Sequence, residues 1–131
     1  MSTITRADEA AIRELVENWA SAVRARNMEG ILASHSQDIL MFDVPPPFQS
    51  KGIEAYRRTW DLFFKWAPDP AVFDIDEMTI TSGQEVAFVT AVMSCVDGAD
   101  KSRLLFRLTI GLTKVGGKWM VMHEHHSVPA D

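Results

Sequence analysis

The chain has 131 residues, of which 47% are hydrophobic and 24% are charged, which indicates one compact domain and excludes a disordered chain. Its net charge of -5 gives no basic face for a nucleic-acid backbone, and one cysteine excludes an intrachain disulfide or a cysteine-based zinc site. The sequence shows neither a signal peptide nor the roughly 18 apolar residues of a membrane span. We therefore expect a single domain over residues 1–131 that is cytoplasmic and binds neither nucleic acid nor membrane.

The first third of the chain shows the spacing of amphipathic helices. Apolar residues recur every three or four positions from Asp8 to Arg26, which predicts a helix capped by Thr5 or Asp8. Asn27 interrupts the pattern, and a second short helix is predicted from Met28 to Ser34.

A short strand and a third helix follow. The stretch Ile39–Val44 is typical of a strand, and it ends at three prolines, Pro45 to Pro47, which cannot donate hydrogen bonds to a sheet. Aromatic residues spaced three to four apart then predict a helix from Ile53 to Trp66. The prolines should form a rigid loop or rim between the two elements.

The second half of the chain is rich in residues that favour strands. Glycine-containing breaks separate four such segments, which predicts hairpins between antiparallel neighbours. The segments are Val72–Thr81, Glu85–Val96, Arg103–Lys114 and Lys118–Ser127. Helices followed by strands place the chain in the α+β class.

The register of the last hairpin decides which side chains share a face. A two-residue turn at Gly116 and Gly117 would pair Val115 with Lys118 and set Val121 opposite Leu112. A regular ladder would then place His123 opposite Ile110 and His125 opposite Leu108 on the apolar face, with Glu124 and His126 facing away. A slip by one residue would instead set the first two histidines beside Thr109 and Arg107, and matching polarity favours the first register.

Several strings resemble the SnoaL-like and ketosteroid-isomerase-like families of the nuclear transport factor 2-like superfamily. The opening ENWASAVRARNMEGILASHSQDILMFDVPPP is similar to the family's paired helices and strand, which ends in an acidic residue and proline. The ending GGKWMVMHEHHSVP resembles the last hairpin of uncharacterised ketosteroid-isomerase homologues. The resemblance implies a cone-shaped α+β barrel, with N-terminal helices packed on a curved, mostly antiparallel sheet. This fold supports many functions, so it does not specify a reaction.

The sequence departs from the steroid isomerases at the oxyanion hole. Those enzymes combine an Asp base with a Tyr and a protonated Asp. Asp43 matches the base, but Trp19 takes the place of the Tyr, and the strand expected to carry the second Asp has Leu108, Ile110 and Leu112. We therefore do not expect steroid isomerase activity.

Three residues are candidates for proton transfer. Asp43 lies at a strand end between apolar residues, where partial desolvation would make it a better base; alternatively, it accepts backbone N–H bonds from the proline loop. His123 and His125 share one strand face and could supply a general acid or an electrophile, or could be structural. These three side chains could in principle hold a metal, but the resembling families mostly work without one, so we expect neither metal nor cofactor.

Aromatic residues and the cysteine complete the candidate pocket. A concave sheet closed by helices often leaves an apolar chamber, and five side chains are predicted to bind substrate there: Trp19, Phe42, Phe48, Tyr56 and Trp60. Cys95 lies in an apolar strand without a neighbouring basic residue, which favours an inert thiol.

Two functions remain open from the sequence. The first is a cofactor-independent isomerase, cyclase or lyase that transfers a proton on an apolar carbonyl compound, with Asp43 as base. The alternative is a non-catalytic ligand-binding or dimerisation module, with a small or filled chamber. Both are compatible with a homodimer, because the resembling folds usually pair through the outer sheet face. The predicted contact face is Arg107, Thr109, Met120, Met122 and His126.

Overall fold

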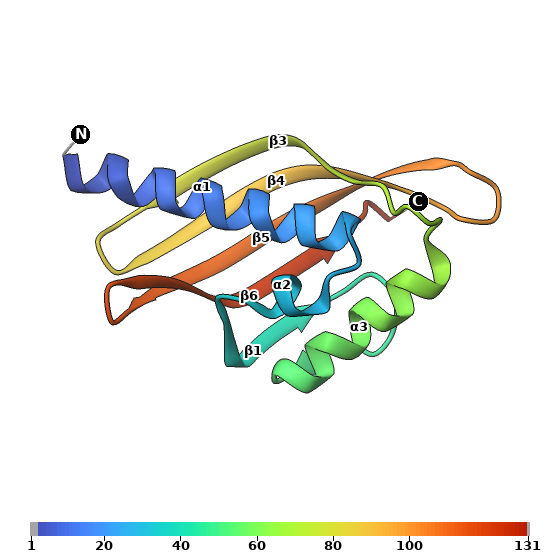
Figure 1. The fold of residues 1–131 in the computed structure, drawn as a ribbon, viewed down its shortest axis with the longest axis horizontal. Helices are drawn as coiled ribbons and strands as arrows, with labels where there is room; N and C mark the ends of the chain where they lie inside the picture. The colour runs from blue at the N-terminus through green and yellow to red at the C-terminus, as the bar shows by residue number, and fades with distance from the viewer. Residues whose placement is uncertain (1–2, 131) are drawn as a thin grey trace.

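The computed structural model describes the backbone of residues 3–130 and the side chains of residues 6–130. Three helices precede or interrupt six strands (Figure 1). In chain order the elements are α1 (Thr3–Arg24), α2 (Met28–Leu32), β1 (His35–Phe42), β2 (Ser50–Lys51), α3 (Ile53–Trp66), β3 (Phe73–Ser82), β4 (Val86–Val96), β5 (Arg103–Val115) and β6 (Lys118–Ser127). No helix among the described residues is long and apolar enough to cross a membrane.

Most predicted elements are confirmed, with differences at both ends: α2 ends at Leu32 and β1 at Phe42, before the predicted Ser34 and Val44, and the short strand β2 was not predicted. α1 begins at Thr3, so Thr5 and Asp8 lie inside the helix and the prediction that either caps it is wrong. α2 is capped as its sequence suggests, because the side chain of Asn27 accepts a hydrogen bond from the backbone N–H of Gly30 at 3.2 Å. β1 begins at His35, four residues before the predicted strand, and this extension brings a histidine into the sheet.

The strands form one curved sheet in the order β2-β1-β6-β5-β4-β3. Within the described residues, β1 and β6 are the one parallel pair. β3 to β6 pair antiparallel in sequence order, as the glycine-containing turns predicted, and β1 also pairs antiparallel with β2. In Figure 1, α1 crosses the sheet in front of β3 to β5, while α3 lies beside β1. The predicted α+β fold class, with helices packed on a mostly antiparallel curved sheet, is confirmed.

The concave face of the sheet and the helices share a single core. Apolar side chains from α1, including Val16 and Val23, pack with Val89 of β4 and Ile110 of β5, and all four are fully or almost fully inaccessible to solvent. Burial of such side chains contributes roughly 1.5–3 kcal/mol each and is the main force holding helices to sheet.

A β-bulge in β6 overturns the predicted register. Val115 pairs with Lys118 and Leu112 with Val121, as expected, but the ladder then shifts and His123 lies opposite Gly111. Met122 is the extra residue, so every later side chain changes face.

After the bulge, Glu124 lies opposite Ile110 and His126 opposite Leu108 on the concave face. His125 lies opposite Thr109 on the outer face. The prediction that Glu124 and His126 face away from the core is therefore wrong. His126 is also excluded from the outer contact face predicted for a dimer, which leaves Arg107, Thr109, Met120 and Met122 on that face; the dimer itself stays a prediction.

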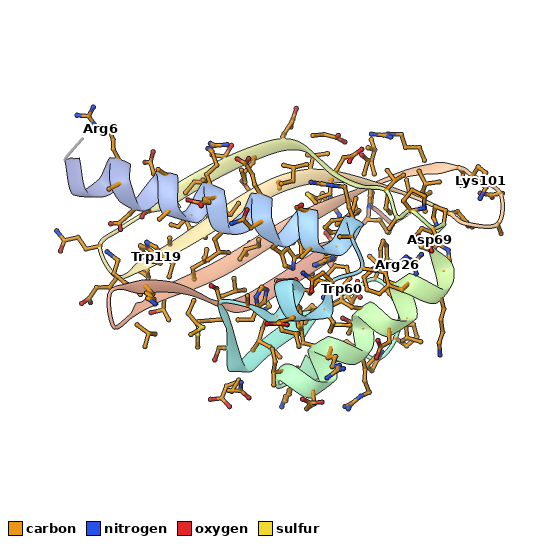
Figure 2. All side chains as sticks on the ribbon, viewed as in Figure 1. Arg6, Arg26, Trp60, Asp69, Lys101 and Trp119 are labelled. Atoms are coloured by element: carbon orange, nitrogen blue, oxygen red, sulfur yellow. The ribbon has the colours of Figure 1, made fainter. Side chains whose placement is uncertain are left out.

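The two ends of the molecule are closed differently. At the end where α1 begins, where Figure 2 labels Trp119, the indole N–H of this residue donates to a carboxylate oxygen of Asp8 at 3.2 Å, and Lys114 lies 2.9 Å from the same oxygen. At the other end, Arg26 donates to the backbone carbonyls of Phe64 and Pro68 and so ties α1 to the end of α3.

Candidate active site

A cavity of about 470 Å³ opens between α3, the end of β1 and the paired ends of β4, β5 and β6. Its volume lies in the range of small-molecule binding sites. The lining is mostly apolar, and its polar side chains are few: Asp43, Thr59, Cys95 and His126. The apolar part consists of Met41, Val44, Pro45, Trp60, Leu62, Phe63, Trp66, Phe73, Leu104, Leu105, Phe106 and Val128.

A buried hydrogen-bond network lies behind this cavity, centred on the carboxylate of Glu124. One carboxylate oxygen, Oε2, accepts from the hydroxyl of Tyr56 at 2.7 Å and lies 2.8 Å from Nε2 of His35. The other, Oε1, lies 3.1 Å from Nε2 of His126. The indole N–H of Trp19 donates to the Tyr56 hydroxyl at 3.0 Å. Side chains from α1, α3, β1 and β6 thus converge on a single carboxylate whose side chain is wholly buried.

His126 connects this network to the cavity. Its ring lines the cavity wall, is 7% exposed, and stacks on Phe106 with ring centroids 5.5 Å apart. Trp19 and Trp60 contact it edge-on. The bond from Nε2 to Glu124 fixes the tautomer with hydrogen on Nε2, and no hydrogen bond among the described residues uses Nδ1. An oriented imidazole therefore keeps one lone pair available to a bound molecule.

The charge states within the network follow from burial and hydrogen bonding. Burial alone would raise the pKa of Glu124, but hydrogen bonds and attraction from His126 and His35 lower it to about 2, so the carboxylate is ionised at neutral pH. Burial and the adjacent Glu124 charge raise the pKa of Tyr56 well above its usual value, so its hydroxyl stays protonated and donates. Burial also raises the pKa of Cys95 to about 11, which keeps this thiol neutral at the cavity wall.

Asp43 lies at the same cavity as His126. It follows the last residue of β1, is half-buried, and lines the cavity together with Val44 and Pro45 of the proline loop. Its Oδ1 accepts the backbone N–H of Val44 at 2.8 Å, so the loop-capping alternative is also realised. The structure thus places the predicted base at the cavity while giving it a local structural contact.

The two histidines singled out from the sequence lie elsewhere. His123 and His125 do not line the cavity: Nδ1 of His123 lies 2.7 Å from the backbone carbonyl of Leu40, and His125 is exposed on the outer face. Their predicted place on the cavity wall is wrong because of the bulge at Met122. Asp43 and these histidines are not brought together, and no group of three or more His, Cys, Asp or Glu that could hold a metal occurs within residues 6–130.

The five predicted substrate-binding side chains divide into three groups. Trp60 lines the cavity, and its indole N–H has no hydrogen-bond partner among the described residues. Trp19 and Tyr56 lie behind the wall, in the network rather than in the cavity. Phe42 packs edge-on against His123 and His125 on the outer side, and Phe48 is 94% exposed. The expectation of contact with a ligand in this cavity is therefore wrong for Phe42 and Phe48.

Sequence reasoning missed His35 and Glu124 and assigned His126 to the wrong face. One signal was present: a glycine inside a strand, here Gly111, often marks a bulge in the pairing. Nothing local identifies His35, because its partner Glu124 lies 89 positions away. Only the parallel pairing of β1 with β6 makes them neighbours.

Comparisons with known protein families and solved structures find proteins of the same fold. The SnoaL-like domain family matches residues 12–131. The chain belongs to this family. It is 36% identical to an NTF2-like protein of unknown function from Pseudomonas putida KT2440, whose crystal structure superposes with a TM-score of 0.89 and covers 100% of this chain and 91% of that one. The predicted membership of the nuclear transport factor 2-like superfamily is confirmed.

More distant solved structures share the fold alone. A candidate scytalone dehydratase from Novosphingobium aromaticivorans DSM 12444 is 16% identical, with a TM-score of 0.83 over 99% of this chain and 89% of that one. A ketosteroid isomerase-like protein from Erwinia carotovora atroseptica SCRI1043 is 15% identical, with a TM-score of 0.73 over 93% and 96%. No curated protein matches the chain.

Proposed function

We propose that this SnoaL-like domain is a cofactor-independent acid–base enzyme, a lyase or isomerase, acting on an apolar carbonyl compound. The observation that carries the proposal is His126, a nearly buried imidazole held by Glu124 with Nδ1 available at an apolar cavity of about 470 Å³. A neutral imidazole oriented by a buried carboxylate is suited to accept and return a proton near neutral pH.

The chemistry requires one residue that both takes and gives a proton. His126 Nδ1 removes the proton next to the substrate carbonyl, which leaves an enolate. The imidazolium then returns this proton either to another carbon, which completes an isomerisation, or to a β-hydroxyl, which leaves as water and yields an enone. In both cases His126 ends neutral, and no external acid or oxidant is consumed.

The other polar groups of the cavity act on the substrate rather than on the proton. The carboxylate of Asp43, which lines the cavity, accepts a hydrogen bond from a substrate hydroxyl. The aromatic wall formed by Phe63, Phe73 and Phe106 favours a flat, apolar carbon skeleton. The names of two distant relatives, a dehydratase and a ketosteroid isomerase-like protein, describe reactions of these two types.

The open cavity also bears on the non-catalytic alternative. The non-catalytic ligand-binding or dimerisation module was expected to have a small or filled chamber, whereas this cavity has room for a small molecule. Binding without turnover remains the competing function, and it makes the opposite prediction for His126.

The test compares His126→Gln with His125→Gln in one set of assays. Apolar β-hydroxy ketones, enones, lactones, epoxides and steroids are screened by thermal shift; a ligand at 100 times its Kd should add about 2.7 kcal/mol, or several degrees. For a compound that binds, we expect turnover by the wild type and by His125→Gln, and a loss of about 10²–10⁴-fold in His126→Gln. Equal turnover by the two variants, or binding without any turnover, would overturn the proposal.

A further inference from the structure

His35 faces a hydrogen-bond acceptor at each of its two ring nitrogens. Nδ1 lies 2.8 Å from the backbone carbonyl oxygen of Ala33, and Nε2 lies 2.8 Å from Oε2 of Glu124. A carbonyl oxygen has no hydrogen to donate, so Nδ1 must carry one. A neutral imidazole would then present a lone pair at Nε2 to an ionised carboxylate inside the core.

We propose that His35 is an imidazolium at neutral pH and that it acts as a positioning residue, balancing the charge of Glu124 so that His126 stays neutral. Rotating the His35 ring by 180° would replace both contacts with carbon and lose both hydrogen bonds, so the orientation is not ambiguous. A hydrogen on each nitrogen satisfies both contacts at once.

The remaining contacts of Glu124 agree with this proton count. The Tyr56 hydroxyl also lies 3.1 Å from Nε2 of His35, but its one hydrogen goes to Oε2 of Glu124 at 2.7 Å and its oxygen accepts the indole N–H of Trp19, so it has no second hydrogen to give to His35. His126 donates through Nε2 to Oε1. The carboxylate therefore receives three hydrogen bonds, from His35, Tyr56 and His126, and one of these donors is a cation. The side chains of His35 and Glu124 are both 0% exposed, and a buried charge of either sign requires such a partner.

The titratable groups of the network come from three of the four elements packed around it, since α1 contributes only the indole of Trp19. β1 contributes His35, α3 contributes Tyr56, and β6 contributes Glu124 and His126. On the cavity side, Asp43 and the neutral thiol of Cys95 line the same space as His126. His35 is thus the cation in direct contact with Glu124 within the described residues.

The consequence for His126 rests on the proposed function. A carboxylate without a compensating cation would attract a second proton to His126 and convert it from a base into an acid. With His35 charged, Glu124 orients the ring of His126 while exerting a much weaker net attraction on a proton at Nδ1. One histidine balances the charge so that the other can work as a base.

The protonation states can be read directly by NMR of the wild-type protein labelled with nitrogen-15 at histidine. At about pH 8 an ordinary imidazole is almost entirely neutral. We expect both ring nitrogens of His35 to carry hydrogen at this pH, while His126 shows hydrogen on Nε2 alone. A neutral His35 at pH 8 would overturn the proposal. The experiment needs no substrate, so its failure is distinct from failure of the proposed function.

A variant tests the tuning of His126. In His35→Gln the cation is lost, and we expect the titration midpoint of His126 to rise by about one pH unit, a tenfold change in proton affinity. His123→Gln is the matched control, because it removes a histidine from β6 that bonds to Leu40 and does not touch Glu124. An unchanged His126 midpoint in folded His35→Gln would contradict the proposal; should that variant not fold, the wild-type spectra decide.

Discussion

The two faces of β6 beyond the bulge carry the same residue type and differ in almost everything else. His126 faces the core, is 7% exposed and is bonded to a buried carboxylate, whereas its neighbour His125 is exposed on the outer face. The residues are adjacent in sequence, so composition cannot distinguish them. Adjacent residues of a strand face opposite sides, and the extra residue Met122 shifts the ladder so that His126, and not His125, faces the cavity.

The faces also differ in how their polar atoms are satisfied. On the inner face, Glu124 receives hydrogen bonds from three other side chains of the fold. On the outer face, His123 has a backbone carbonyl as partner, and solvent is near. A substitution on the inner face therefore leaves buried polar groups without a hydrogen-bond partner. On the outer face, water can replace the hydrogen bond that a substitution removes.

The largest expected effect comes from removing the inner carboxylate. Glu124→Ala strands His35, His126 and the Tyr56 hydroxyl without their common acceptor, and we expect the free energy of unfolding to fall by about 3–5 kcal/mol. Urea unfolding measures this change. The outer-face control, His125→Ala, should stay within about 0.5 kcal/mol of wild type. A loss below 1 kcal/mol in Glu124→Ala would show that the network does not stabilise the fold.

A second prediction concerns stability at low pH. Protonation of Glu124 on the inner face should lower the free energy of unfolding, whereas the outer face should contribute no such loss. The pKa of Glu124 is about 2 in the folded protein and near its usual 4.5 when unfolded. Because the folded value is the lower one, the stabilisation from this group is complete above about pH 4.5 and is lost as the pH falls toward about 2. The contribution of this group to the slope approaches about 1.4 kcal/mol per pH unit between these limits.

The measurement is urea unfolding at a series of pH values from 6 downward, roughly in half-unit steps. Asp8 and Asp100 also have lowered pKa values, through hydrogen bonds from Lys114 and Ser102 respectively, and add to the wild-type slope. Glu124→Gln keeps them and removes the buried carboxyl titration together with the charge that pairs with His35, so the difference between the two curves reports the Glu124–His35 pair. Parallel curves for wild type and Glu124→Gln would contradict the assignment.

The sequence predicted the fold well because the signals that define it are local. Apolar spacing located α1 and α3, and the glycine-containing turns located the hairpins of β3 to β6. Asp43 and Trp60, which the sequence offered as site residues, line the cavity, and the roles given to them stay predictions. These residues belong to segments whose structure follows from a few neighbours.

The site itself could not be predicted to the same degree, because it depends on one irregularity and one long-range pairing. Polarity matching set His123 opposite Ile110, which is correct for a regular ladder but not for a bulged one. His35 and Glu124 become partners only when the parallel pairing of β1 and β6 has formed. Neither their spacing nor their neighbours in sequence indicates that pairing.

The smallest expected effect tests what sets the bulge that divides the two faces. Gly111 lies opposite His123 and its φ is not positive; an added Cβ would meet the Cβ of His123 at 3.6 Å, an ordinary contact. We therefore expect Gly111→Ala to leave the bulge in place and to stabilise the protein by about 0.4–1 kcal/mol, through the lower entropy of the unfolded chain. Thermal unfolding measures the change in stability, and the NMR signal of His126 shows whether the bulge stays in place.

Gly98 provides the contrast for this last substitution. An added Cβ there would lie 2.6 Å from the backbone oxygen of Trp66, which cannot move without shifting the end of α3, so Gly98→Ala should destabilise. If Gly111→Ala behaved in the same way, or displaced the His126 signal, the glycine itself would set the bulge. If it is tolerated, the bulge is maintained by the bonds of Glu124 and His126 in the core, and the inner face determines the register of the whole strand end.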